Sequence, residues 1–107
     1  MSKHVKEITG EELKELLAQK GVVVCDFWAT WCGPCRMLAP VLEQLAEEFK
    51  DRAIFVKLDI DKDTETALSY GVMSIPDVFV FENGEVVDHN LGYLPVEQMR
   101  EFLEENL

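Results

Sequence analysis

The chain has 107 residues, 48% of them hydrophobic, which predicts one globular domain, residues 1–107, with a modest core. Ten basic and twenty-one acidic residues give a formal net charge of −11. This argues against nonspecific binding to nucleic acid or to anionic membranes, because both need a basic surface. Solubility explains the acidity, and attraction to partners with positive docking faces is the alternative.

The N-terminal residues 1–7 contain neither an apolar core nor a cleavage site of the kind found in signal peptides. No apolar run approaches the roughly 20 residues that a membrane helix needs. We therefore expect a cytoplasmic protein with no membrane contact. In that compartment a cysteine pair is more often redox-active or metal-binding than structural.

A short edge strand is predicted over residues 5–8, followed by a helix. Thr9 and Glu12 have the form of a capping box, which marks the start of that helix. The helix is expected to end near Lys20, because Gly21 follows it.

Apart from Asp26, residues 22–28 are apolar at both odd and even positions. This pattern is typical of a central strand covered on both faces. A long helix is predicted over residues 34–49, with a kink at Pro40 where the ring removes a backbone hydrogen bond. A further strand is predicted over residues 53–60.

A short helix is expected over residues 64–70, and strands over 78–81 and 85–90. The two strands flank Asn83-Gly84, a dipeptide that favours a tight antiparallel hairpin, and Pro95 opens a last helix. Helical crossovers make the early strands parallel, so the order of elements predicts a mixed α/β sheet.

The most informative segment is Trp-Cys-Gly-Pro-Cys at residues 31–35, directly after the buried strand. Cys32 can lie exposed ahead of the helix, where free backbone N–H groups and the helix dipole favour a thiolate. Pro34 suits the first helical turn, and Cys35 lies one turn on, within reach of whatever Cys32 has bonded. This arrangement indicates thiol–disulfide exchange.

The chain resembles the thioredoxin family over essentially its whole length. The motifs that carry the resemblance recur in family order and spacing: residues 26–37, Pro40, Lys57-Leu58-Asp59, Ser74-Ile75-Pro76, Asn83-Gly84-Glu85 and Gly92. A bare Cys-x-x-Cys also occurs in zinc and haem sites, but the whole set is specific. The resemblance implies the thioredoxin fold, α/β with a five-stranded mixed sheet flanked by four helices.

The resemblance implies a thiol–disulfide oxidoreductase that carries electrons to protein disulfides. Cys32 would be the nucleophile and Cys35 the resolving thiol, and a thioredoxin reductase would recycle the oxidised pair. No bound cofactor is expected, since the chain has no dinucleotide fingerprint and NADPH and FAD would reside on the reductase. A monomer is expected.

Asp26 is the unusual residue of its strand, since an unpaired carboxylate there is costly and tends toward a raised pKa. Alternation puts it on the same face as Trp28. The resemblance places this carboxyl beneath the active site, where it would help to remove a proton from Cys35, with Lys57 as its partner. The alternative is a purely structural buried ion pair.

The resemblance also implies a substrate-binding surface around the sulfurs. Its members would be Trp31, Gly33, Pro34, Ile75, Pro76 and Gly92. Pro76 matches the cis-proline of the family, whose loop can pair with an extended substrate, although a trans proline at a strand start is the plainer interpretation. The alternative for Gly92 is an ordinary turn residue.

The chain departs from the family pattern at Asp77, where most thioredoxins have Thr. If its carboxylate points toward the sulfurs, it opposes thiolate formation at Cys32 and slows attack, and if it points to solvent, little changes. The third cysteine, Cys25, lies among valines and is interpreted as a small buried hydrophobe, with a regulatory thiol as the alternative.

The residues are also compatible with other functions. The same chemistry serves oxidases and isomerases, and thioredoxin-like domains also act as non-catalytic binding modules. A zinc site would need Cys32 and Cys35 with ligands from Cys25, His4 or His89, which lack the spacing of a second ligand pair. A static disulfide is disfavoured, because so short a loop restrains little chain entropy.

Overall fold

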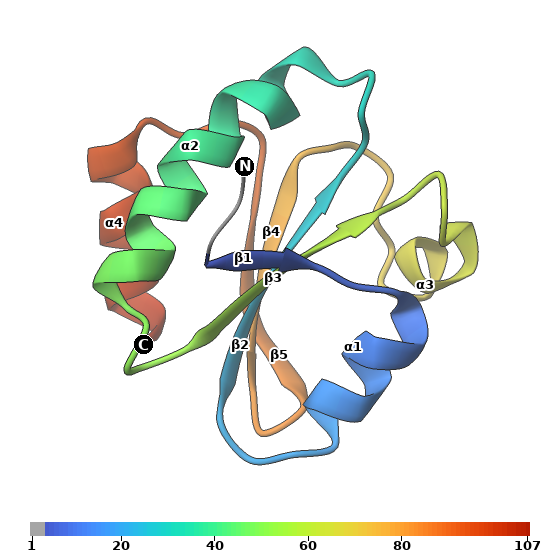
Figure 1. The fold of residues 1–107 in the computed structure, drawn as a ribbon, viewed down its shortest axis with the longest axis horizontal. Helices are drawn as coiled ribbons and strands as arrows, with labels where there is room; N and C mark the ends of the chain where they lie inside the picture. The colour runs from blue at the N-terminus through green and yellow to red at the C-terminus, as the bar shows by residue number, and fades with distance from the viewer. Residues whose placement is uncertain (1–3) are drawn as a thin grey trace.

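A five-stranded sheet of strand order β1-β3-β2-β4-β5 forms the centre of the structure, a computed structural model that describes residues 4–107 (Figure 1). The strands are β1 (Val5–Glu7), β2 (Val22–Trp28), β3 (Ile54–Asp59), β4 (Asp77–Glu82) and β5 (Glu85–Leu91). The helices are α1 (Gly10–Leu17), α2 (Gly33–Glu48), α3 (Thr64–Ser69) and α4 (Val96–Asn106). Each element lies within a few residues of its predicted range.

The sheet is mixed, as predicted. Strands β1 and β2 both pair in parallel with β3, whereas β4 pairs antiparallel with both β2 and β5. The helical connections account for the parallel pairs, since a parallel neighbour needs a crossover. The central strand β2 is buried along almost its whole length, which confirms the interpretation of its two apolar faces.

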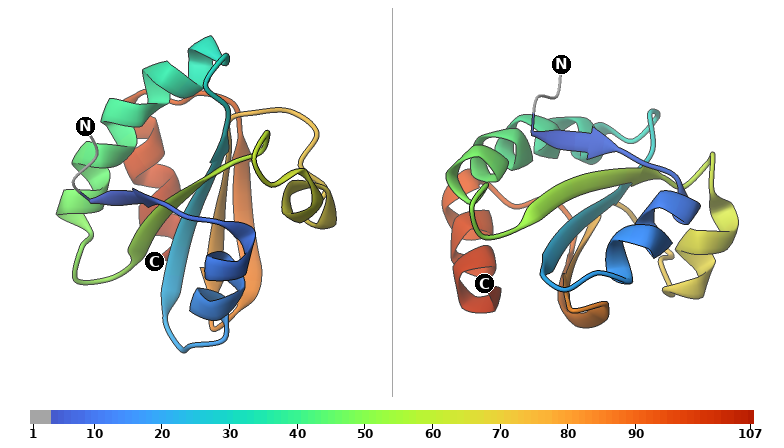
Figure 2. Two further views of the ribbon diagram at one scale, coloured as in Figure 1. Left: turned by 45° about the vertical axis from the view of Figure 1, so that its right-hand side comes forward. Right: turned by 60° about the horizontal axis from the view of Figure 1, so that its bottom comes forward.

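The helices cover the two faces of the sheet, with α2 and α4 on one side and α1 and α3 on the other (Figure 2). Strand β2 contributes to both cores: Val24 packs with Leu38, Leu42 and Leu45 of α2, whereas Cys25 packs with Leu13 of α1. Side chains of β2 therefore alternate between two hydrophobic layers, and Asp26 shares the α2 side with Val24.

The capping box at the start of α1 is confirmed. The Thr9 hydroxyl accepts the Glu12 backbone N–H at 3.1 Å, and the Glu12 carboxylate accepts that of Thr9 at 2.9 Å. The helix ends at Leu17, however, three residues before the predicted end near Lys20. Residues 18–21 form a turn instead, in which Gly21 donates its N–H to Asn83 Oδ1 at 2.9 Å and so ties this segment to the β4–β5 turn.

Asn83 and Gly84 make the predicted tight turn. Both have positive φ, 52° and 88°, as a two-residue hairpin turn of right-handed twist requires. None of the helices among residues 4–107 is long and apolar enough to cross a membrane.

Candidate active site

Cys32 and Cys35 form a disulfide at the N-terminus of α2, with their Cα atoms 5.2 Å apart. Cys32 is the N-cap residue, and its sulfur accepts the Cys35 backbone N–H at 3.2 Å. Pro34 occupies the first turn of the helix, as predicted. The Cys32 sulfur therefore lies where a free backbone N–H and the positive end of the helix dipole stabilise negative charge.

Cys32 is less accessible than the sequence suggests. The two cysteines are only 5% and 2% exposed, whereas we expected the first sulfur to be exposed ahead of the helix. They pack with Ala29 into a small cluster that Trp28, Ile60 and Ile75 complete. Residues that follow β2, β3 and α3 in the chain cover the sulfurs, and local sequence does not reveal such a contact.

Asp26 is 4% exposed in the middle of β2, and its Oδ1 has no hydrogen-bond partner among the described residues. Burial raises the pKa of this carboxyl to about 7, against the lowering effect of the Lys57 ammonium group, and the Asp77 carboxylate adds to the rise. A carboxyl with a pKa near neutral can both accept and return a proton at physiological pH.

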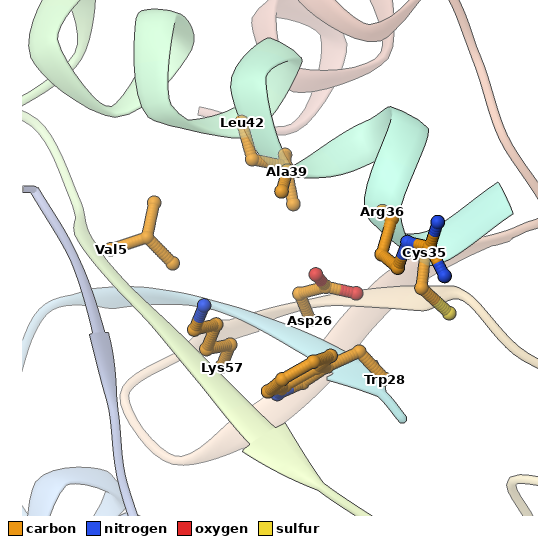
Figure 3. Close-up of a pocket in the computed structure, with 8 residues that line it drawn as sticks. All are labelled: Val5, Asp26, Trp28, Cys35, Arg36, Ala39, Leu42 and Lys57. Carbon is orange, nitrogen blue, oxygen red and sulfur yellow. The ribbon is translucent and has the colours of Figure 1, made fainter. Parts of the chain in front are cut away.

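A small cavity of about 40 Å³ connects Asp26 with Cys35. Its lining includes Asp26, Trp28, Cys35, Arg36 and Lys57, so strands β2 and β3 and helix α2 all contribute. In Figure 3 the Asp26 carboxyl group lies between Lys57 and Cys35. This arrangement agrees with the expectation from strand alternation that Asp26 shares a face with Trp28, and with the position beneath the cysteines that the resemblance implied.

Lys57 stands directly across from Asp26 in the β2–β3 ladder. Its ammonium nitrogen lies over the Trp28 ring, 4.6 Å from the ring centroid, which is a cation–π contact. Among residues 4–107, the ion pairs of lysine and arginine at 4 Å or less involve Lys62 and Arg100, and none involves Lys57. Lys57 therefore acts on Asp26 through its field rather than through a close ion pair.

The peptide bond between Ile75 and Pro76 is cis, as the resemblance implied. The Ile75 carbonyl oxygen lies 3.8 Å from Cys32 Sγ, and the Gly92 N–H donates to the Pro76 carbonyl at 2.7 Å. Gly92 has a φ of 100°, a backbone conformation that favours glycine. The fold thus brings Ile75, Pro76 and Gly92 together beside the sulfur of Cys32.

Trp31 and Gly33 lie on the accessible side of the disulfide. Trp31 is 65% exposed, and its indole N–H donates to Asp61 Oδ2 at 2.8 Å. A Cβ atom placed on Gly33 would have open space around it. The contact with Asp61 was not predicted, because nothing in the sequence pairs two residues thirty positions apart.

Asp77 takes neither of the two orientations expected for it. The residue is 4% exposed, and Oδ1 lies 2.9 Å from Nδ1 of His89 on β5. Burial raises the pKa of this carboxyl above its ordinary value, while the hydrogen bond and charge of His89 oppose the rise. The sequence indicated His89 only as a candidate zinc ligand, and its contact with Asp77 was not predicted.

Cys25 is fully buried on the face of β2 opposite Asp26. Burial, followed by the negative charge of Asp26, raises the pKa of its thiol well above the ordinary value. The thiol therefore stays protonated and packs as a small hydrophobe, in agreement with the sequence interpretation. Among the described residues, no three His, Cys, Asp or Glu side chains gather as a metal-binding group.

Comparisons with known proteins agree with this geometry. The thioredoxin family model matches residues 4–105. A thioredoxin of Bacillus subtilis (strain 168) is 51% identical over 88 residues, covering 82% of this chain and 85% of that protein. A thioredoxin of Staphylococcus aureus (strain N315) is 49% identical over 89 residues, covering 83% and 86% respectively.

Proposed function

Because this chain belongs to the thioredoxin family, we propose that Cys32 is the nucleophile of its reaction and Cys35 the resolving thiol. The protein is a thiol–disulfide oxidoreductase that reduces protein disulfides and is recycled by a thioredoxin reductase. The observation that carries the two roles is the hydrogen bond from the Cys35 N–H to Cys32 Sγ at the start of α2. It favours negative charge on the first sulfur over the second.

In the proposed reaction, the Cys32 thiolate attacks one sulfur of a substrate disulfide, whose S–S bond breaks. One substrate sulfur leaves as a thiolate and takes up a proton, and a mixed disulfide joins the other to Cys32. Cys35 then loses its proton and attacks Cys32 Sγ, which releases the second substrate thiolate. Two electrons have passed to the substrate, and the disulfide of this structure is the oxidised product.

Asp26 is the proposed acceptor for the proton of Cys35. Both residues line the same cavity, and its volume of about 40 Å³ is large enough for a single water molecule to relay the proton. A pKa of about 7 suits a group that takes a proton in one half of the cycle and returns it in the other. Lys57 is proposed to support the ionised form of Asp26 through its positive charge.

The proposed substrate-binding surface consists of Trp31, Gly33, Pro34, Ile75, Pro76 and Gly92. An extended substrate segment would pair with the backbone of the Ile75–Pro76 loop, a form of strand addition, with its disulfide over Cys32. The proximity of the Ile75 carbonyl to Cys32 Sγ supports this placement. The large exposed side chain of Trp31 supplies apolar contact area beside it.

The remaining proposals concern the surroundings of the reaction. We propose that the protein binds no cofactor, that the NADPH and FAD of the electron supply reside on the reductase, and that the protein acts as a monomer. A dithiol reductant works only where a reductase regenerates it, so a cytoplasmic location is proposed.

Two experiments test the proposed function. A Cys35→Ser variant should accumulate a mixed disulfide with an oxidised protein substrate, whereas Cys32→Ser should form none, and the reverse pattern would exchange the two roles. The Cys32–Cys35 reduction potential should lie at about −270 mV, which is the general reference value for thioredoxins. A value above about −200 mV would indicate an oxidase or isomerase instead.

A further inference from the structure

His89 and Asp77 form a side-chain pair at the end of the sheet that holds the active site. The imidazole Nδ1 lies 2.9 Å from the Asp77 carboxylate, which is 5% exposed, while the His89 side chain is 50% exposed. The imidazole also stacks on Phe79, with ring centroids 4.8 Å apart and an interplanar angle of 29°. The ring is therefore held from two sides, by an aromatic neighbour and by a buried hydrogen-bond acceptor.

Asp77 connects His89 to the loop that lies beside Cys32. It is the first residue of β4 and follows the cis Ile75–Pro76 bond directly, and the Ile75 carbonyl lies 3.8 Å from Cys32 Sγ. Two bonds hold this short segment, one from β5 and one from Gly92, the residue that follows β5. Gly92 donates its backbone N–H to the Pro76 carbonyl, and His89 holds the side chain of the next residue.

We infer that His89 is a positioning residue for substrate docking, which acts through Asp77 to hold the Ile75–Pro76 loop against the Cys32 sulfur. This inference rests on the docking role of that loop in the proposed function. When a buried carboxylate loses its hydrogen-bond donor, the free-energy cost of burying its charge is no longer offset, so it protonates or turns toward water. Because Asp77 is covalently joined to Pro76, either response moves or loosens the loop.

The variant His89→Phe separates the two contacts of the ring. Phenylalanine retains an aromatic ring that can stack on Phe79 but offers no donor to Asp77. We expect the KM for oxidised insulin to rise about fivefold, the equivalent of one lost hydrogen bond, with kcat unchanged. A small aromatic disulfide does not need the loop, so its reduction rate and the Cys32–Cys35 potential should remain at wild-type values.

His89→Asn is the matched control. The asparagine amide nitrogen can occupy the place of Nδ1 and donate to Asp77, so this variant should recover most of the wild-type KM although it lacks the aromatic ring. Should His89→Phe fail to fold, the double variant Asp77→Leu, His89→Phe removes both polar groups and leaves no unpaired carboxylate. It should show the same rise in KM, because the side-chain contact is absent.

A Gly92→Ala variant distinguishes failure of this inference from failure of the proposed function, because Gly92 donates its N–H to the Pro76 carbonyl and its φ of 100° is strained for alanine. If Gly92→Ala raises the KM and His89→Phe does not, the loop docks substrate without help from His89, and the inference is wrong. If neither variant changes the KM, the docking role of the loop is itself wrong. If His89→Asn raises the KM as much as His89→Phe does, a donor to Asp77 is not enough to hold the loop, and the inference that His89 acts through this bond is wrong.

Discussion

Asp26 and Trp28 lie two residues apart on one face of β2, and neither Asp26 Oδ1 nor Trp28 Nε1 has a hydrogen-bond partner among residues 4–107. Both atoms are buried, and both residues line the cavity that reaches Cys35. Buried polar atoms without partners lower the stability of the folded state. Such a cost beside a reactive pair is typical of a site in which a pKa has been shifted for function.

The first prediction concerns the pH dependence of stability. The pKa of Asp26 is about 7 in the folded protein and near 3.8 in the unfolded chain, so the unfolded chain releases its proton first as pH rises. The contribution of Asp26 to stability is therefore fully present below about pH 4, falls between about pH 4 and 7, and stays lost above that. Three pKa units correspond to at most about 4 kcal/mol.

Asp26→Asn lacks this ionisation, so its free energy of unfolding relative to wild type should rise between pH 4 and pH 8 by up to about 4 kcal/mol. Urea unfolding of the oxidised proteins at several pH values measures this difference. The curve should level off above pH 8. A difference that stays constant over the whole range would mean that folding does not raise the pKa of Asp26.

The second prediction concerns the role of Asp26 in the reaction. Asp26→Asn should slow release of the second substrate thiol, the step assigned to Cys35, by about 100-fold near pH 7, because a positioned general base is lost. Release of the first thiol, which follows attack by Cys32, should keep its rate and serves as the internal control. The difference should narrow at high pH, where Cys35 ionises unaided. Equal rates of second-thiol release across pH would contradict the assignment.

The third prediction concerns the effect of Asp77 on Asp26. The two residues lie on adjacent antiparallel strands, since Asp77 stands across from Phe27, and the negative charge of Asp77 raises the pKa of Asp26. Asp77→Asn should therefore lower the pKa of Asp26 below about 7, measured from the pH titration of its carboxyl carbon by NMR. Asp59→Asn, which alters another buried carboxylate, is the control and should leave that titration unchanged.

The fold and the reactive pair could be predicted from the sequence because their signals are local. Strand alternation placed Asp26 and Cys25 on opposite faces, and the chemistry of the 31–35 segment located the sulfurs at a helix start. The capping box and the Asn83-Gly84 turn likewise depend on residues that are close in sequence.

Contacts between distant segments could not be predicted in this way. The partner of Asp77 lies twelve residues away across the hairpin, and a bulge at Val80 and Phe81 shifts the register between them. The low exposure of Cys32 results from residues that follow β2, β3 and α3, which local patterns do not bring together. The segment after α1 is tied to the β4–β5 turn by the bond between Gly21 and Asn83, again a contact between distant parts of the chain.

The last prediction separates backbone strain from steric clash at two glycines of the proposed substrate-binding surface. A Cβ on either Gly92 or Gly33 would meet no atom within 4 Å, but only Gly92 has a positive φ, of 100°. Gly92→Ala should therefore lower the free energy of unfolding by about 1–2 kcal/mol through strain alone. Gly33→Ala, in the first turn of α2, should change it by less than about 0.5 kcal/mol or stabilise slightly.

Urea unfolding of the two oxidised variants measures these changes, and Gly92→Asn provides a further control. Asparagine tolerates positive φ better than alanine, so Gly92→Asn should be less destabilised than Gly92→Ala although its side chain is larger. The opposite order would mean that space around Gly92, rather than its backbone conformation, limits the residue there. Because the Gly92 N–H donates to the Pro76 carbonyl, the strain in Gly92→Ala should also raise the KM for oxidised insulin.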